Sequence, residues 1–329
     1  MILYHVSEIY KNFKSKEQLS IMILNKKYKI VTSNPYTNEV LHGRGIVIRS
    51  KWKDSYAAVI ANHGIKHLFL NYSLGWECDD YSFLASMTGI KSVDIIDCHS
   101  RGIEAIEYLA DIETLSLNVP DAYDIDYRKF NGLKSLFCYG RKTNGSLYEC
   151  RSLEELYIDE FRSANSQLIG YLRSLKRLTI ANSDLSDLSF LCDLNELTHL
   201  ALINCKAITS FKPISFLHYL NRLEIRGSRI HDVSFLGDVT SLSLETLIIE
   251  TDYLDSIGPM KNLTSLKALA LIGSKMVIKD GDLTAINSLK NLSMLNIPNR
   301  MIYSHQIHNY WNWKDYGAHS QVWITPKTK

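Results

Sequence analysis

Two histidines near the C-terminal end, His305 and His308, have the spacing in this sequence that is most compatible with a chemical site. Imidazoles three positions apart could share a metal ion. A metal site needs further ligands, and no cysteine or carboxylate cluster with ligand spacing accompanies these histidines. The sequence therefore predicts no metal site and no cofactor, and it favours a structural role for both histidines in a C-terminal cap.

The motifs of common enzyme classes are missing from the sequence. It contains no GxSxG, HExxH, P-loop or GxGxxG pattern, and its glycines stand singly at turns instead of forming a phosphate cradle. Asp280-Gly281-Asp282 begins like a calcium loop but lacks the later acidic ligands of an EF-hand. We therefore predict that the protein is not an enzyme. An enzyme with a site on the C-terminal cap, built from His305, His308 and nearby aromatic residues, stays open as an alternative.

The cysteines are too sparse for a disulfide framework. Six thiols stand in a chain of 329 residues, and no two of them form a CxxC motif. This usage is typical of reduced thiols in a cytosol. The six are Cys78, Cys98, Cys138, Cys150, Cys192 and Cys205.

Composition and charge exclude several classes of protein. Apolar residues make up 46% of the chain and charged residues 22%, which is typical of a globular protein and excludes disordered and coiled-coil classes. The net charge is only +2, so neither nucleic acid nor an anionic membrane is predicted as a partner. Residues 1–16 lack the apolar core of a signal peptide, and no apolar run of 18 residues occurs. We therefore expect a cytoplasmic protein.

The elements that must position any site come from an internal repeat. The phrase apolar-x-x-apolar-x-apolar recurs eleven times at intervals of 20 to 26 residues, which indicates one unit of about 22 residues. The phrases begin at Ile65, Ile90, Ile112, Leu133, Leu153, Leu175, Leu197, Leu220, Leu244, Leu266 and Leu292.

Two periods inside one unit predict its structure. Positions 4 and 6 are apolar and alternate with polar residues, as in a short strand with one buried face. Positions 11, 14, 17 and 20 repeat every three residues, which suits 3₁₀ turns or a short helix on the far side. One unit cannot bury its own apolar face, so neighbouring units must stack. The predicted fold class is therefore an α/β solenoid, with a curved parallel sheet on the concave face and 3₁₀ turns or short helices on the convex face.

This pattern resembles the leucine-rich repeat family, specifically its class of about 22 residues found in internalin-like bacterial proteins. The resemblance covers about 240 residues. It implies an asparagine or a cysteine at position 9, whose side chain hydrogen-bonds the turn backbone, but in this chain smaller groups mostly replace the asparagine. The residues at that position include Cys98, Ser183, Cys205, Ser228, Asp252 and Ser274.

A C-terminal phrase carries a second, narrower resemblance. Lys279-Asp280-Gly281-Asp282-Leu283, followed by Asn299-Arg300 and Tyr303-Ser304-His305, is similar to the closing repeat of bacterial leucine-rich repeat proteins that accompany polymorphic toxins. This resemblance implies a small cytosolic companion of a toxin.

The predicted domain organisation is one solenoid with a cap at each end. Residues 1–64 form an N-terminal cap that includes a degenerate first repeat, residues 65–303 form eleven repeats, and residues 304–329 form a C-terminal cap. Within the N-terminal cap we expect a hairpin of Leu19–Leu24 with Tyr28–Val31, and a helix within 52–63 that ends at Gly64. The aromatic segment around Tyr310, Trp311, Trp313, Tyr316 and Trp323 is expected to cover the last repeat.

The strand residues whose side chains are not required for the core lie on the solvent side of the strands. Positions 3, 5, 7 and 8 of each unit point to or border this side, because residues alternate around the buried positions 4 and 6. They predict an aromatic centre with an acidic rim, then a basic strip, then an apolar patch. The predicted partner-binding residues are Phe137, Tyr139, Glu155, Tyr157, Asp159, Glu160, Arg177, His199, Arg222 and Arg226. The apolar patch consists of Ile248, Ala268, Ala270, Ile272 and Met294.

Clustered aromatic and arginine side chains are typical of protein interfaces. Ordinary cross-strand packing of the aromatic residues is the alternative. We therefore predict a non-enzymatic protein-binding module, most specifically a bacterial immunity protein that neutralises a toxin by covering it. A general interaction scaffold and a glycan-recognising protein stay open as alternatives.

Overall fold

The computed structural model describes residues 27–98, 101–119, 125–140, 145–239, 243–308 and 323–326. The chain divides into two compact units. The first consists of Met1–Cys138 and Lys142–Cys150, and the second of Tyr139–Arg141 and Arg151–Lys329. The predicted boundaries at residues 64 and 303 separate the caps from the repeats, whereas the compact units are groups of residues in contact with one another. These boundaries therefore stay a prediction.

The first unit begins with a hairpin. Strand β1 (Tyr28–Ser33) pairs antiparallel with β2 (Val40–Ile48), and β2 pairs parallel with β3 (Ile65–Asn71). The expected partner of Tyr28–Val31, Leu19–Leu24, lies outside the described residues. The strand was therefore predicted correctly, but the partner that the structure gives it is β2.

Helix α3 (Ser55–Asn62) connects β2 to β3, as the sequence predicted. Tyr56 and Ile60 are one helical turn apart and both are buried. Gly64 has a φ of +59°, a left-handed conformation that glycine adopts without strain and that ends the helix. No helix in the described ranges has the length and apolar character needed to cross a membrane.

Each later repeat contributes a strand, and the strands pair in parallel in the order of the sequence. The remaining strands of the first unit are β4 (Ser92–Ile96), β5 (Thr114–Asn118) and β6 (Ser135–Tyr139), whose last residue belongs to the second unit. The strands of the second unit are, in sheet order, β7 (Glu155–Asp159), β8 (Arg177–Ala181), β9 (His199–Ile203), β10 (Arg222–Arg226), β11 (Thr246–Glu250), β13 (Ala268–Ile272) and β15 (Met294–Asn296). We call the solvent side of these strands the strand face of each unit.

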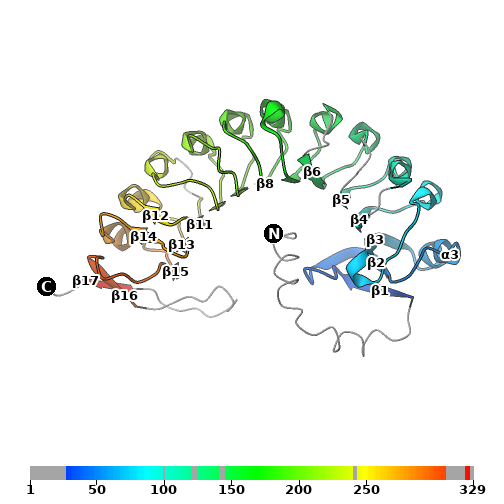
Figure 1. Ribbon diagram of the computed structural model, residues 1–329, viewed down its shortest axis with the longest axis horizontal. Helices are drawn as coiled ribbons and strands as arrows, with labels where there is room; N and C mark the ends of the chain where they lie inside the picture. The colour runs from blue at the N-terminus through cyan, green and yellow to red at the C-terminus, as the bar shows by residue number, and fades with distance from the viewer. Residues whose placement is uncertain are drawn as a thin grey trace. The chain divides into compact units, whose positions relative to one another are not determined.

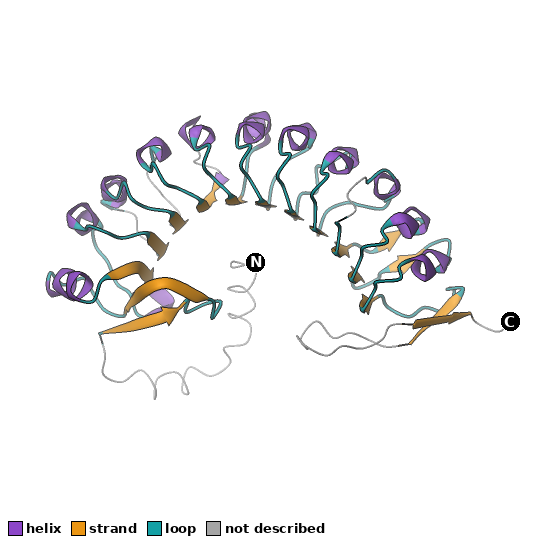
Figure 2. Ribbon diagram, turned by 180° about the vertical axis from the view of Figure 1, so that it is seen from behind, coloured by secondary structure: helices purple, strands orange, loops and turns teal. Residues whose placement is uncertain are grey.

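Short 3₁₀ helices lie on the side of each unit opposite to the strands (Figure 1). The first unit has η1 (Tyr72–Leu74), η2 (Ser82–Ser86), η3 (Ile103–Tyr108), η4 (Tyr127–Lys129) and η6 (Gly145–Glu149). The second has η7 (Ser163–Tyr171), η8 (Ser189–Asp193), η9 (Lys212–Phe216), η10 (Ser234–Gly237), η11 (Gly258–Asn262) and η12 (Thr284–Ser288). Figure 2 shows the same arrangement from behind, with helices and strands on opposite sides of each unit.

Two small sheets complete the second unit. Strand β12 (Tyr253–Leu254) pairs with β14 (Val277–Ile278), and β16 (His305–His308) pairs antiparallel with β17 (Trp323–Pro326). Tyr310, Trp311, Trp313 and Tyr316, which were expected to cover the last repeat, lie outside the described residues.

The core lies between the strands and the 3₁₀ helices, where the repeat pattern predicted it. Every residue predicted at positions 4 and 6 of the eleven strands is buried, and none is more than 6% exposed. Burying one leucine or isoleucine side chain stabilises a protein by about 2 kcal/mol. The stacked pairs are therefore a principal source of stability in both units, and the predicted solenoid architecture is confirmed.

Side chains in the turns link one repeat to the previous one. The Ser183 hydroxyl donates to the Phe161 carbonyl oxygen at 2.7 Å, and the Thr251 hydroxyl donates to the Ile230 carbonyl oxygen at 2.9 Å. In the repeat that contains Thr251, the turn residue was predicted to be Asp252, but Asp252 is exposed and Thr251 is buried. The turn there is therefore displaced by one residue from the consensus position.

Candidate functional site

The strand face of the second unit brings most of the predicted site residues into rows. Strands β7 to β10 pair in register, so Glu155, Arg177, His199 and Arg222 follow one another across the sheet. Adjacent strands lie about 4.8 Å apart, so neighbours in a row are within reach of one another. A partner that contacts one residue of this row therefore meets its neighbours too.

Two of the predicted aromatic anchors are buried. Phe137, in the first unit, is 6% exposed, and Tyr157, in the second, is 7% exposed. Both were predicted to face solvent, and this prediction is wrong. Both stand at position 5, in the middle of a strand, where a large side chain is flanked by neighbouring strands. Burial, with the nearby Asp159 carboxylate, raises the pKa of Tyr157 well above its usual range.

Tyr139 is the aromatic residue that stays half-exposed. It stands at position 7, at the end of β6, and it belongs to the second unit. Its phenol ring combines a large contact area with a hydroxyl group that tolerates a wet rim. Of the three predicted aromatic anchors, Tyr139 therefore has the exposure that a binding anchor needs.

The basic strip is present but partly neutralised. Arg177 is 59% exposed, and its Nε lies 3.3 Å from an oxygen of Glu155. On β10, Glu224 forms salt bridges with both Arg222 and Arg226. Sequence reasoning left Glu224 out of the site, although residues two apart on one strand share a face. Arg177 is therefore the accessible cation of the strip, whereas Glu224 holds Arg222 and Arg226 in place.

His199 lies between two arginines of the same row. Burial lowers the pKa of His199, and the charges of Arg177 and Arg222 lower it further. Its Nδ1 lies 2.8 Å from the Thr198 hydroxyl, which in turn donates to the Lys176 carbonyl oxygen. The imidazole is therefore neutral at pH 7, and the charge of the strip there comes from its arginines.

A polar ladder runs along the ends of β7, β8 and β9. The Asn182 amide donates to Oδ1 of Asp159 at 2.7 Å, and the Asn204 amide donates to Oδ1 of Asn182 at 2.9 Å. Position 8 of these repeats is left-handed, with φ of +53° at Glu160, +50° at Asn182 and +55° at Asn204. In the next repeat this position is Gly227, where a Cβ would lie 2.1 Å from the Asn204 side-chain oxygen. The ladder is therefore a shared feature of the turns that follow β7, β8 and β9.

We expect Glu160→Asn to stabilise the protein by about 0.5–1 kcal/mol. Asparagine tolerates the left-handed conformation better than glutamate does. The matched control is the reverse change in the next repeat, Asn182→Glu. It should destabilise the protein, because it places a glutamate in a left-handed conformation and removes the amide that donates to Asp159. Urea unfolding at pH 7 measures both. A loss of stability in Glu160→Asn would show that contacts of the glutamate outweigh its backbone strain.

The apolar patch is smaller than the sequence predicted. Ala268 and Ala270 are 8% and 7% exposed and therefore offer little surface. Ile248, Ile272 and Met294 are half-buried. Ile248 is paired with Ala270 in register, and Ile272 lies on the same strand as Ala270. A narrow strip of apolar side chains thus continues the strand face beyond the charged rows.

His305 and two of the cysteines, Cys138 and Cys205, lie in surroundings that do not favour chemistry. His305 is 6% exposed, and its Nδ1 lies 2.8 Å from the Ser304 hydroxyl. No group of three metal-ligating side chains occurs in the part of the chain that the structure describes. Burial raises the pKa of the Cys138 thiol to about 12 and that of Cys205 to about 11, so neither forms a nucleophilic thiolate at pH 7.

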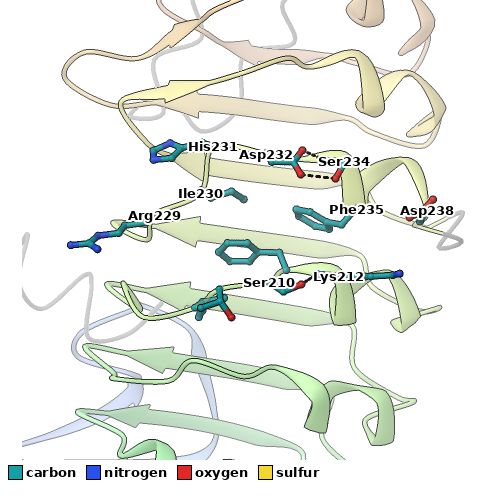
Figure 3. A pocket seen from close by; sticks show the side chains of 12 residues that line it. Ser210, Lys212, Arg229, Ile230, His231, Asp232, Ser234, Phe235 and Asp238 are labelled. Atoms are coloured by element: carbon teal, nitrogen blue, oxygen red, sulfur yellow. Dashed lines mark hydrogen bonds between the residues drawn. The ribbon is translucent and has the colours of Figure 1, made fainter.

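A shallow pocket of about 400 Å³ lies beside the strands, between the turns at 208–212 and 229–238. In Figure 3, Arg229 and His231 lie at one end of it and Lys212 and Asp238 at the other. The buried rings of Phe211 and Phe235 are part of its lining and stack on each other, with centroids 5.9 Å apart. The Asp232 carboxylate accepts from the backbone NH and the hydroxyl of Ser234 (Figure 3). This carboxylate therefore holds Ser234, the first residue of η10, which is a structural role.

No family model matches the sequence, and no curated protein matches it. Solved structures do match it in fold. An internalin, InlF, from Listeria monocytogenes aligns with a TM-score of 0.50 at 18% identity, over 76% of this chain and 79% of that one. A TDR receptor aligns with a TM-score of 0.51 at 19% identity, over 75% of this chain and 45% of that one. A leucine-rich repeat protein of Leptospira interrogans, LIC12759, aligns with a TM-score of 0.43 at 16% identity, over 76% and 75%.

The likenesses to the internalin and to the TDR receptor confirm the fold class. The chain has the leucine-rich repeat fold of the internalin type, as the 22-residue period predicted. At such low identity the likeness is one of fold alone. This chain also spans less than half the length of the TDR receptor. Function must therefore be argued from the strand face itself.

Proposed function

We propose that the strand face of the second unit binds another protein. The observation that carries this proposal is the in-register row of Glu155, Arg177, His199 and Arg222, bordered by half-exposed Tyr139 and by the ladder from Asp159. Charges of both signs next to an aromatic anchor give a protein interface its specificity and its rate of association.

The more specific proposal is that the chain is a bacterial immunity protein that acts in the cytoplasm and neutralises a toxin by occlusion. The C-terminal phrase around Asp280-Gly281-Asp282 supports it, because it is similar to that of toxin companions. A rigid sheet of stacked strands covers a partner without rearrangement, and steric covering needs no chemistry of its own. The proposed partner is a protein, not nucleic acid, because the net charge of the chain is only +2.

The test is a titration of the purified product of the neighbouring gene with the full chain. We expect Tyr139→Ala to weaken binding about tenfold or more, as truncation of an aromatic anchor does. Arg177→Glu should mainly slow association, because it reverses an exposed charge in the basic strip. Arg173→Glu is the matched control, since Arg173 is exposed but precedes β8 and lies outside the strand. It should leave affinity within about twofold of the wild type.

The outcomes separate the general proposal from the specific one. Equal affinity in Tyr139→Ala, Arg177→Glu and Arg173→Glu, with folding intact, would remove this strand face from the interface. Tight binding that leaves the activity of the partner unchanged would reject neutralisation by occlusion while keeping the binding module. Binding together with loss of toxic activity supports both.

A further inference from the structure

In the second unit, backbone hydrogen bonds join connections that lead from a strand to the following 3₁₀ helix, and this backbone ladder is interrupted at the pocket. The Thr209 N–H donates to the Ser186 carbonyl oxygen of the previous repeat at 3.3 Å. Further along the chain, the Asp255 N–H donates to the His231 carbonyl oxygen at 3.0 Å. Within the described range 145–239, no backbone hydrogen bond joins Thr209 to His231. One rung of the backbone ladder is therefore missing.

The connection before the pocket contains one residue more than the connections on either side of it. Eight residues connect β9 to η9, whereas seven connect β8 to η8 and seven connect β10 to η10. An extra residue on one side of a hydrogen-bonded pair disrupts the pairing locally, as it does in a β-bulge. The two connections therefore lose their register, and the pocket of about 400 Å³ lies between them.

The missing rung leaves a donor and an acceptor without partners. Asp255 shows the direction of the backbone ladder, because its N–H donates to the previous repeat and its carbonyl oxygen accepts from Asp280 of the next repeat. By the same direction, the Thr209 carbonyl oxygen and the His231 N–H point into the space between their repeats. Neither group has a hydrogen-bond partner among the described residues, and both residues line the pocket. A peptide unit, which carries one donor and one acceptor, matches this pair.

One end of the pocket offers an unpaired cation. Arg229 is exposed there, and its guanidinium has no ion-pair partner in the part of the chain that the structure describes. The acidic residues of the lining do not neutralise it. The hydrogen bonds of the Asp232 carboxylate go to η10, and Asp238 lies at the other end of the pocket (Figure 3). This end is therefore suited to a carboxylate, which a guanidinium binds through two parallel hydrogen bonds.

The neighbouring repeat holds His231 in place. The His231 ring stacks on the Tyr253 ring, with centroids 3.9 Å apart and an interplanar angle of 6°. Its Nδ1 lies 3.3 Å from the Tyr253 carbonyl oxygen, which can only accept, so Nδ1 carries a proton. The Lys279 Nζ lies 3.5 Å from the centroid of the same Tyr253 ring. These contacts fix one wall of the pocket before a ligand arrives, which lowers the entropic cost of binding.

We propose that this pocket binds an extended peptide segment of another protein in which a large apolar residue adjoins an acidic one. The backbone of the segment completes the missing rung between Thr209 and His231. Its apolar side chain packs against the lining phenylalanine rings, and its carboxylate pairs with Arg229. The pocket lies beside the strand face and shares no residue with it, so this site is independent of the proposed function.

A titration of the isotope-labelled full chain, followed by nuclear magnetic resonance, tests the proposal. The probe is a blocked tetrapeptide of alternating phenylalanine and aspartate. We expect the backbone amide of His231 to shift saturably, with a Kd of about 1 mM or lower. The same peptide with alanine for phenylalanine, or with asparagine for aspartate, should bind about tenfold more weakly, because it lacks the apolar group or the charge.

Hydrogen exchange of single amides in the full chain measures the missing rung directly. Without the peptide, the His231 N–H should exchange faster than the Asp255 N–H, which is bonded in the backbone ladder. With saturating peptide, the exchange of the His231 N–H should slow by about tenfold or more. A His231 N–H that is already as protected as that of Asp255 would overturn the proposal, because the protein itself would then complete the rung.

Arg229→Ala should weaken binding of the phenylalanine–aspartate peptide about tenfold and leave binding of the asparagine peptide unchanged. The matched control is Lys206→Ala. Lys206 is exposed at the same position of the previous repeat as Arg229 but does not line the pocket. It should keep the affinity within about twofold of the wild type. The absence of a saturable shift, or equal weakening in both variants, would overturn the proposal.

Discussion

Replacing Leu223 with aspartate is expected to destabilise the second unit by about 4 kcal/mol or more, one of the two largest effects that we predict. Leu223 is the second residue of β10 and is fully buried, in register with Leu200 on β9 and Leu247 on β11. A carboxylate at this position has an apolar neighbour on each side. Each repeat buries its apolar face against the next one, so the loss should spread to the adjoining repeats.

Urea unfolding of the full chain measures this effect, with Thr246→Asp as the matched control. Thr246 is half-buried on the strand face of β11, and a carboxylate there can reach water. The control should cost less than about 1 kcal/mol. Leu223→Asp with the wild-type midpoint would show that residue 223 does not face the core and that the register of β10 is wrong.

The strands and their buried positions could be predicted from the sequence because one pattern repeats eleven times. A single phrase such as Leu175-Lys176-Arg177-Leu178 is ambiguous, but its recurrence at a nearly constant interval leaves one way to stack the units. The turn displaced to Thr251 escaped the prediction because the consensus counts residues, whereas the buried hydroxyl follows the local backbone.

The strand face was harder to predict, because exposure there depends on neighbours that the repeat does not specify. Alternation places Tyr157 and Asp94 on the solvent side, yet both are buried. Asp94 is paired with Phe69 on β3 and with Ser116 on β5, and these neighbours are not specified by the repeat. For the basic strip, the pairing of Glu224 with Arg222 and Arg226 reduces the free charge that a count of arginines suggests.

Asp94→Asn is expected to remove a pH dependence of stability that the wild-type protein must have. The pKa of Asp94 is about 7 in the folded chain, against an ordinary value of 3.8. Between these values the folded state binds more protons than the unfolded state, so the free energy of unfolding falls as the pH rises from about 4 to 7 and is level above 7. At 1.36 kcal/mol per pKa unit the fall is about 4 kcal/mol at most.

Urea unfolding at pH 5, 6, 7 and 8 tests this prediction in the wild type and in Asp94→Asn. The difference in stability between the two proteins should move in favour of the asparagine variant by about 2 kcal/mol or more between pH 5 and 7, and then stay constant to pH 8. Taking the difference cancels the titration of every other group, including His199, whose lowered pKa also makes stability depend on pH. A difference that does not change with pH would mean that Asp94 ionises normally in the folded chain.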